Sequence, residues 1–135
     1  MNADGSERRQ VSRVGVMGHY SRWSRDGEWI YFRRQSAGSQ VHRVPVAGGE
    51  PEALPQVAGG SHLSLSPDES RILDVLGHKE LWVSPVGPGE AEKVFEFDDP
   101  EVRIDYPVWS NGGDWVLFDR FCPRGGDIWM MENAE

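Results

Sequence analysis

The chain has 135 residues, 38% of them hydrophobic, with six Trp, five Phe, three Tyr and a formal net charge of −8. This length and apolar content suffice for one domain with a buried core, and nothing in the composition requires a cofactor. The acidic balance argues against a nucleic-acid partner, the single Cys122 excludes an intrachain disulfide framework, and no apolar run approaches the roughly 18 residues of a membrane span.

Twelve short strands are predicted, and no stretch keeps a helical period over ten residues. In chain order, the first is expected over 9–14. The next four are expected at 19–23, 29–34, 40–45 and 52–57, four more at 62–65, 71–76, 80–84 and 91–95, and the last three at 106–109, 114–120 and 127–131. Gly, Pro, Asn and Asp favour tight turns, and they separate the apolar runs at Asp26-Gly27, Pro67-Asp68 and Asn111-Gly112.

The chain repeats itself three times. The segment 23–32 returns as 65–74 and 109–118, so that Ser24, Ser66 and Ser110 are 42 and 44 residues apart, and a second block, 41–52, returns as 81–92. Four strands in about 43 residues is the period of a β-propeller blade. We therefore predict an all-β fold, a β-propeller segment of about three four-stranded antiparallel blades over 19–57, 62–95 and 106–131.

The third copy stops before its fourth strand, whereas the predicted strand over 9–14 precedes the first copy. Propellers close by removing their sheet edges. We expect the strand over 9–14 to complete a blade across the ends.

The repeated strings WSRDGEWIYF, LSPDESRILDV and WSNGGDWVLF resemble the TolB-type propeller repeat, WSPDG followed by an apolar strand. VHRVPVAGGEPEAL fits the same repeat, and the resemblance covers nearly the whole chain. Leu65 departs from the pattern by replacing the Trp, and Asn111-Gly112-Gly113 by replacing Pro-Asp-Gly. The resemblance implies a piece of a larger ring, most like its C-terminal half. Relatives attach such rings to regulators, kinases or peptidases, and no such catalytic domain is visible here.

The repeated residues favour structural roles. Trp23, Leu65 and Trp109 precede the turns, where large side chains can pack between neighbouring blades. The Ser-x-Asp-Gly unit can bond its own backbone and hold the turn. Stacking of a carbohydrate on an exposed Trp is the alternative interpretation.

Three side chains are candidates for ligand binding at the axial mouth. His19, His62 and Asp105 lie five, four and five residues before the repeated Ser, so each blade brings one of them toward the central channel. Two imidazoles and a carboxylate could hold a divalent metal. No short-spaced ligand pair supports that idea, so solvated turn residues are the favoured interpretation, and we predict neither a metal nor a catalytic residue.

The leading hypothesis is a non-catalytic TolB-like interaction scaffold whose partner is a protein or a small-molecule ligand. One alternative is a ligand- or metal-binding propeller attached to an enzyme or regulator. Another is a half-propeller that forms a homodimer and closes a six-bladed ring. The polar N-terminus has no signal-peptide apolar region and the implied relatives are often periplasmic, so the compartment stays open.

Overall fold

In the computed structural model, residues 4–12, 21–34, 40–54, 60, 62–122 and 125–132 are described. They form eleven strands in three antiparallel sheets, so the predicted all-β fold of a propeller segment is confirmed. These residues include no helix, and hence none long and apolar enough to cross a membrane.

Each sheet corresponds to one copy of the repeat, and we call the sheets blades one, two and three. Blade one contains β1 (Arg22–Trp23), β2 (Trp29–Arg33), β3 (Val41–Pro45) and β4 (Glu52–Leu54). Blade two contains β5 (Leu63–Leu65), β6 (Arg71–Leu76), β7 (Glu80–Pro85) and β8 (Glu92–Glu96). Blade three contains β9 (Arg103–Trp109), β10 (Trp115–Cys122) and β11 (Gly125–Glu132). Neighbouring strands are consecutive in the chain, because short turns join antiparallel strands.

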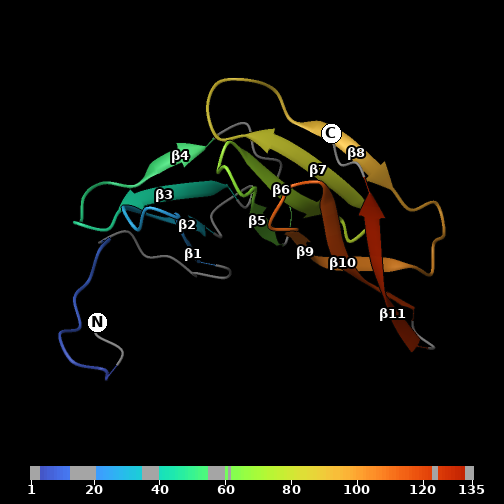
Figure 1. Ribbon diagram of the computed structural model, residues 1–135, viewed down its shortest axis with the longest axis horizontal. Helices are drawn as coiled ribbons and strands as arrows, with labels where there is room; N and C mark the ends of the chain where they lie inside the picture. The colour runs from blue at the N-terminus through green and yellow to red at the C-terminus, as the bar shows by residue number, and fades with distance from the viewer. Residues whose placement is uncertain are drawn as a thin grey trace.

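The blades follow one another along an arc, with blade one at one end, blade three at the other and blade two between them (Figure 1). Strand register decides which side chains face which blade, because directly opposed residues share a face of a sheet. In blade two, the row Leu65–Ile72–Ser84 faces blade one and the row Ser64–Leu73–Val83 faces blade three.

Two hydrophobic clusters fill the spaces between the blades. The cluster between blades one and two consists of Tyr31, Val41, Leu54, Leu63 and Ile72. The cluster between blades two and three consists of Leu73, Val75, Leu81, Val102, Ile104, Trp109, Val116 and Phe118. Successive residues of a strand point to opposite faces, so β6 contributes to both clusters. Blade two is thus buried on both faces.

The turns that begin at Ser24, Ser66 and Ser110 form the same corner in each blade. Gly27 and Gly113 adopt φ values of 74° and 81°, a left-handed conformation that glycine reaches without steric cost. Blade two places Glu69 at this position with a φ of 60°, which costs about 1 kcal/mol in a residue with a Cβ. Its carboxylate accepts a hydrogen bond from the backbone N–H of Arg25, so this residue also links the corners of blades one and two.

The predicted strand over 9–14 is not formed at residues 9–12, and residues 13 and 14 lie outside the described part. The Arg9 guanidinium instead donates hydrogen bonds to the carbonyls of Val46 (2.6 Å) and Ala47 (3.5 Å), beside blade one. The backbone N–H and C=O groups of a strand need hydrogen-bond partners on the edge strand of a sheet. Among the described strands, β11 is the edge strand of blade three and lies at the opposite end of the arc, so residues 9–12 are not beside it (Figure 1).

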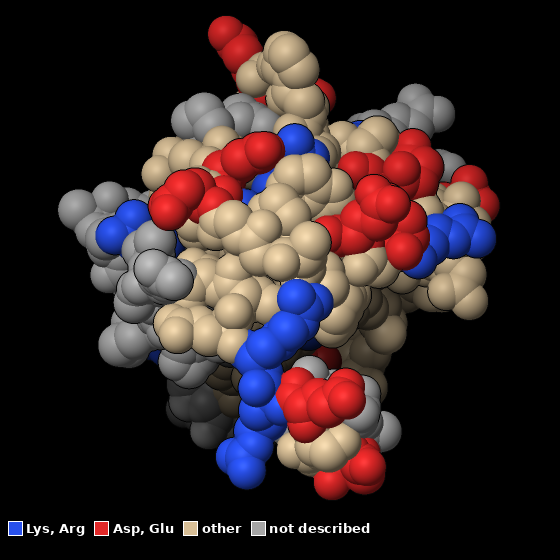
Figure 2. All heavy atoms as spheres, turned by 90° about the vertical axis from the view of Figure 1, so that its left-hand side faces the viewer, with Lys and Arg blue, Asp and Glu red and all other residues tan. Residues whose placement is uncertain are grey.

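Among the described residues, the basic first third of the sequence does not produce a broad basic surface on the side that Figure 2 shows. Residues 1–45 contain eight Arg and four acidic residues. Figure 2 shows one narrow line of Lys and Arg atoms beside Asp and Glu atoms, further Lys and Arg atoms at the left, right and top, and uncharged residues across the middle.

Candidate functional site

The first strands of the blades position the candidate functional residues at their two ends. β5 and β9 both run toward their Ser corners, at Ser66 and Ser110, while His62 and Asp105 lie toward the opposite ends of these strands. The repeat therefore creates two separate polar regions, one at the corners and one around Asp105.

The corners are held by the predicted local hydrogen bonds. In blade one, the Ser24 hydroxyl donates to Asp26 (2.5 Å) and accepts from the backbone N–H of Trp29 (2.9 Å). Blade two repeats this arrangement with Ser66, which donates to Asp68 (2.6 Å) and accepts from the N–H of Arg71 (3.0 Å). These bonds lower the pKa of Asp26 and lower that of Asp68 to about 2, chiefly because the serine hydroxyl stabilises the carboxylate. The serines are thus turn residues, and their hydroxyls are occupied.

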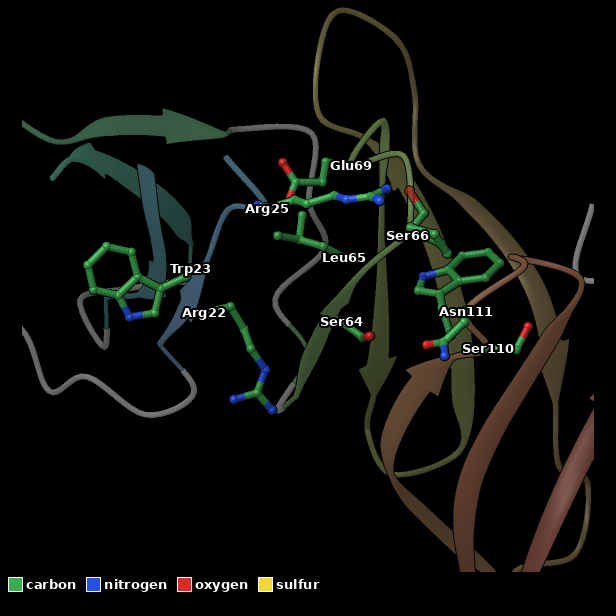
Figure 3. A pocket seen from close by; sticks show the side chains of 11 residues that line it. Arg22, Trp23, Arg25, Ser64, Leu65, Ser66, Glu69, Ser110 and Asn111 are labelled. Carbon is green, nitrogen blue, oxygen red and sulfur yellow. The ribbon is translucent and has the colours of Figure 1, made fainter. Parts of the chain in front are cut away.

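A cavity of about 610 Å³ opens where the three corners approach one another. Its lining comes from all three blades and consists of Arg22, Trp23, Arg25, Ser64, Leu65, Ser66, Pro67, Glu69, Trp109, Ser110 and Asn111. Figure 3 shows Arg25 reaching toward the corner of blade two, whereas the indole of Trp23 points away from blades two and three. Trp23 is 61% exposed and Trp109 only 9%. The cavity offers cationic and aromatic groups, which suit an anionic or planar ligand.

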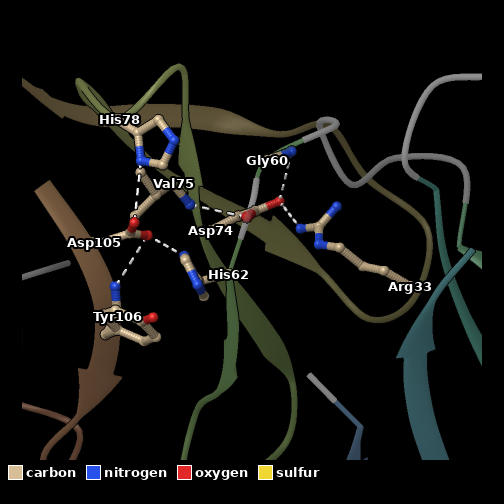
Figure 4. Close-up of polar contacts among 8 residues, drawn as sticks. All are labelled: Arg33, Gly60, His62, Asp74, Val75, His78, Asp105 and Tyr106. Carbon is tan, nitrogen blue, oxygen red and sulfur yellow. Dashed lines mark hydrogen bonds and ion pairs between the residues drawn. The ribbon is translucent and has the colours of Figure 1, made fainter. Parts of the chain in front are cut away.

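At the other ends of these strands, Asp105 contacts two imidazoles (Figure 4). One carboxylate oxygen pairs with Nδ1 of His62, and the other lies 3.1 Å from Nδ1 of His78, in the turn between β6 and β7. The backbone N–H of Tyr106 donates to the same carboxylate (3.3 Å), and the rings of Tyr106 and His62 lie 4.2 Å apart. Asp105 thereby ties blade three to blade two.

Burial lowers the pKa of His62 below its ordinary value, and the attraction of Asp105 opposes that shift without overcoming it. His62 is therefore neutral at pH 7, and its contact with Asp105 is a hydrogen bond from an imidazole N–H to a carboxylate. This arrangement orients an imidazole and can assist a proton transfer.

A third polar contact lies between blades one and two. Arg33 on β2 and Asp74 on β6 form an ion pair whose side chains are 3% and 1% exposed. Asp74 also accepts hydrogen bonds from the backbone N–H groups of Gly60 (3.2 Å) and Val75 (2.8 Å). Burial raises the pKa of Asp74 to about 6, and Arg33 opposes that rise. Figure 4 shows Arg33 and Asp74 pointing toward each other from blades one and two.

Of the predicted ligand-binding residues, the structure brings His62 and Asp105 into direct contact, and His19 lies outside the described residues. Within the described ranges, no group of three or more His, Cys, Asp or Glu is arranged to hold a metal ion. Sequence reasoning missed His78. It also missed the ion pair between Arg33 and Asp74. Each of these charged residues stands in a strand that is otherwise apolar, and a buried charge needs a partner of opposite charge.

Comparison with solved structures identifies the fold. Oligogalacturonate lyase from Vibrio parahaemolyticus is similar at a TM-score of 0.70 and 18% identity, over 97% of this chain and 40% of that one. TolB from Acinetobacter baumannii is similar at a TM-score of 0.60 and 12% identity, over 90% and 33%. The chain has a TolB-like β-propeller fold. A gluconolactonase from Xanthomonas campestris is also similar, at a TM-score of 0.60 and 20% identity, over 98% and 54%.

These similarities establish the fold alone, since each identity is 20% or less. The chain spans about a third to a half of the length of these three proteins. No family model matches the sequence, and the search of curated proteins gave no match.

Proposed function

We propose that this chain is a non-catalytic TolB-like β-propeller segment that acts as an interaction scaffold. The observation that carries the proposal is the cavity of about 610 Å³ that three blades enclose at their corners. Its walls carry an exposed indole and two guanidinium groups, whereas the hydroxyls of Ser66 and Ser110, which also line it, bond within their own corners. Such a surface suits binding of a protein or a small ligand more than proton transfer.

The inner polar contacts support the same proposal, because they join blades. Arg33–Asp74 links blades one and two, and His62–Asp105 links blades two and three. A rigid arc with its binding residues in surface loops is how propellers generally present a ligand surface.

The test is an assay with the substrates that the structural neighbours' names suggest. The purified chain is incubated with oligogalacturonate, followed by the absorbance of the unsaturated product, and with gluconolactone, followed by acid release. We expect no turnover above buffer with either substrate. Turnover that rises with chain concentration and is lost in Asp105→Asn would overturn the proposal, since it would give the His62–Asp105 pair a catalytic role.

A second candidate function is a ligand-binding part of a larger enzyme or regulator, and the C-terminal half of a larger ring is the form that the repeat suggests. The contact of Asp105 with two imidazoles brings side chains of the metal-ligand type together, but the described residues include no group of three or more that is arranged to hold a metal ion. Calorimetric titration with Zn²⁺ and Mn²⁺ tests this candidate. Binding heat that disappears in His62→Ala supports it, and the absence of heat rejects it for metals.

A further inference from the structure

A departure of blade two from the repeat leaves room in the cavity at the three corners. Leu65 stands where blades one and three carry Trp23 and Trp109, since each of the three residues ends the first strand of its blade and precedes the corner serine. Leu65 lines the cavity, and in Figure 3 its side chain lies between those of Arg22 and Arg25. Leucine is smaller than tryptophan, so the space beside it is wider than the repeat itself would give.

Two guanidinium groups border this space, and neither forms an ion pair with a carboxylate of the described residues. The Arg22 side chain donates to the carbonyl of Ser21 (3.3 Å), and the Arg25 guanidinium has no printed partner within the described ranges. By contrast, Arg33 and Arg43 of the same blade each pair with a carboxylate. A guanidinium carries five N–H donors, so both groups in the cavity retain donors for an anionic ligand.

The two cations of the cavity are not equivalent. Glu69 also lines the cavity, and its carboxylate accepts the backbone N–H of Arg25. Figure 3 shows Glu69 beside Arg25, whereas the Arg22 guanidinium lies apart from both and points toward the strand that carries Ser64. Glu69 therefore offsets the charge of Arg25, and Arg22 is the uncompensated cation. Two guanidinium groups and one carboxylate leave the lining with a net charge of +1, which a single negative charge neutralises.

The rest of the lining suits an uncharged body next to that negative charge. Leu65, Pro67 and Trp109 offer apolar surface, and Ser64 and Asn111 offer hydrogen-bonding groups. The volume of about 610 Å³ is that of a small-molecule site. A polyanion is a poorer fit, because the whole chain has a formal net charge of −8 and repels it.

We propose that this cavity binds a small organic monocarboxylate, with one carboxylate on a flat apolar body. The carboxylate pairs with the Arg22 guanidinium, whose fork of N–H groups matches two carboxylate oxygens, and the body packs on Leu65. The inference rests on the proposed function, because it names the ligand class of the same cavity. Inorganic phosphate has the charge but no apolar body, and it is therefore the weaker ligand.

Calorimetric titration of the 135-residue chain with 2-naphthoate at pH 7 tests the inference. We expect one probe to bind per chain with a dissociation constant of about 1 mM or lower. The uncharged 2-naphthamide and inorganic phosphate should each bind at least about 10-fold more weakly. Naphthamide or phosphate binding as tightly as naphthoate would overturn the proposed ligand class. So would the absence of saturable naphthoate binding up to about 10 mM.

One pair of variants tests the carboxylate-binding residue. Arg22 is exposed, so Arg22→Gln retains the fold by circular dichroism, and we expect it to weaken naphthoate binding by about 10-fold. Arg103→Gln is the matched control, since Arg103 is an exposed arginine on β9 that does not line the cavity, and it should leave the affinity unchanged. Equal losses in the two variants would overturn the assignment to Arg22.

A second pair separates the space in the cavity from its charge. Leu65→Trp restores the residue that blades one and three carry, so the fold is retained while the indole fills the cavity and abolishes naphthoate binding. Glu69→Gln removes the negative charge and keeps an oxygen for the Arg25 N–H, so it should tighten naphthoate binding about threefold. Unchanged affinity in Leu65→Trp, or weaker binding in Glu69→Gln, would overturn the proposed site.

NMR of the indole N–H groups locates the bound probe. Naphthoate should shift the signal of Trp109, which lines the cavity and is assigned with Trp109→Phe, and should leave that of Trp82, which donates to Glu80 (2.7 Å). The reverse pattern would overturn the site. The proposed function fails separately: turnover of oligogalacturonate or gluconolactone overturns the scaffold and leaves naphthoate binding intact, whereas absence of naphthoate binding overturns this inference and leaves the scaffold with a protein partner.

Discussion

The ion pair between Arg33 and Asp74 predicts a large stability change for one substitution. Arg33→Met removes the guanidinium and preserves most of the side-chain volume. It leaves the Asp74 carboxylate, 1% exposed, with the backbone N–H groups of Gly60 and Val75. Breaking a buried pair by removing one partner costs about 3–5 kcal/mol. A domain typically has about 5–15 kcal/mol of stability in total, so the variant should unfold at a much lower denaturant concentration.

Guanidinium denaturation followed by Trp fluorescence at pH 7 measures this loss. The double variant Arg33→Met/Asp74→Leu should recover most of it, because apolar groups replace a buried ion pair at little cost. Arg43→Met is the matched control. Its pair with Glu52 spans 2.9 Å, but the side chains are 29% and 53% exposed, and an exposed pair contributes about 1 kcal/mol or less. The reasoning is refuted if Arg33→Met costs no more than Arg43→Met.

The pH dependence of stability gives an independent reading of the same carboxyl group. Burial raises the pKa of Asp74 from 3.8 to about 6, so the folded chain binds this proton more tightly than the unfolded chain does. The free energy of unfolding therefore falls as the pH rises from about 4 through 6. Between pH 4 and 6, the free energy of unfolding of the wild type should fall by on the order of 3 kcal/mol relative to that of Asp74→Asn. Parallel curves for the two proteins would contradict the assignment.

Three further outcomes are expected. Gly60→Ala should prevent stable folding, as judged by circular dichroism, because a Cβ there would overlap the Asp74 carboxylate and the Val75 carbonyl; normal melting would contradict this. In urea denaturation, Ser66→Ala should lower the free energy of unfolding by about 1–2 kcal/mol and Ser110→Ala should lower it by less. The reason is that the Ser66 hydroxyl also donates a hydrogen bond to Asp68. Equal losses in the two variants would count against the corner hydrogen bonds. Asp105→Asn should lower the pKa of His62 further in an NMR titration, because Asp105 opposes the shift; an increase would reverse our electrostatic account.

The corners were predictable because their interactions are local. Ser66, Asp68 and Arg71 lie within six residues of one another, so the turn chemistry of the repeat implies their hydrogen bonds. The contacts of Asp105 with His62 and His78 were predictable only in part. The spacing placed His62 and Asp105 at matching points of two blades, but His78 comes from the turn between β6 and β7, the two middle strands of blade two, and no repeat position marks it.

The amino-acid sequence by itself determined the number of blades, the strands within them and the chemistry of the turns, because these depend on short-range periodicity and on residues that favour tight turns. Tertiary structure alone decided which charges meet and which faces remain open. Arg33 and Asp74 are 41 residues apart and pair because two twisted sheets stack at one angle. The same stacking buries Trp109 and leaves Trp23 exposed at the equivalent position, a difference that belongs to the place of each blade in the arc.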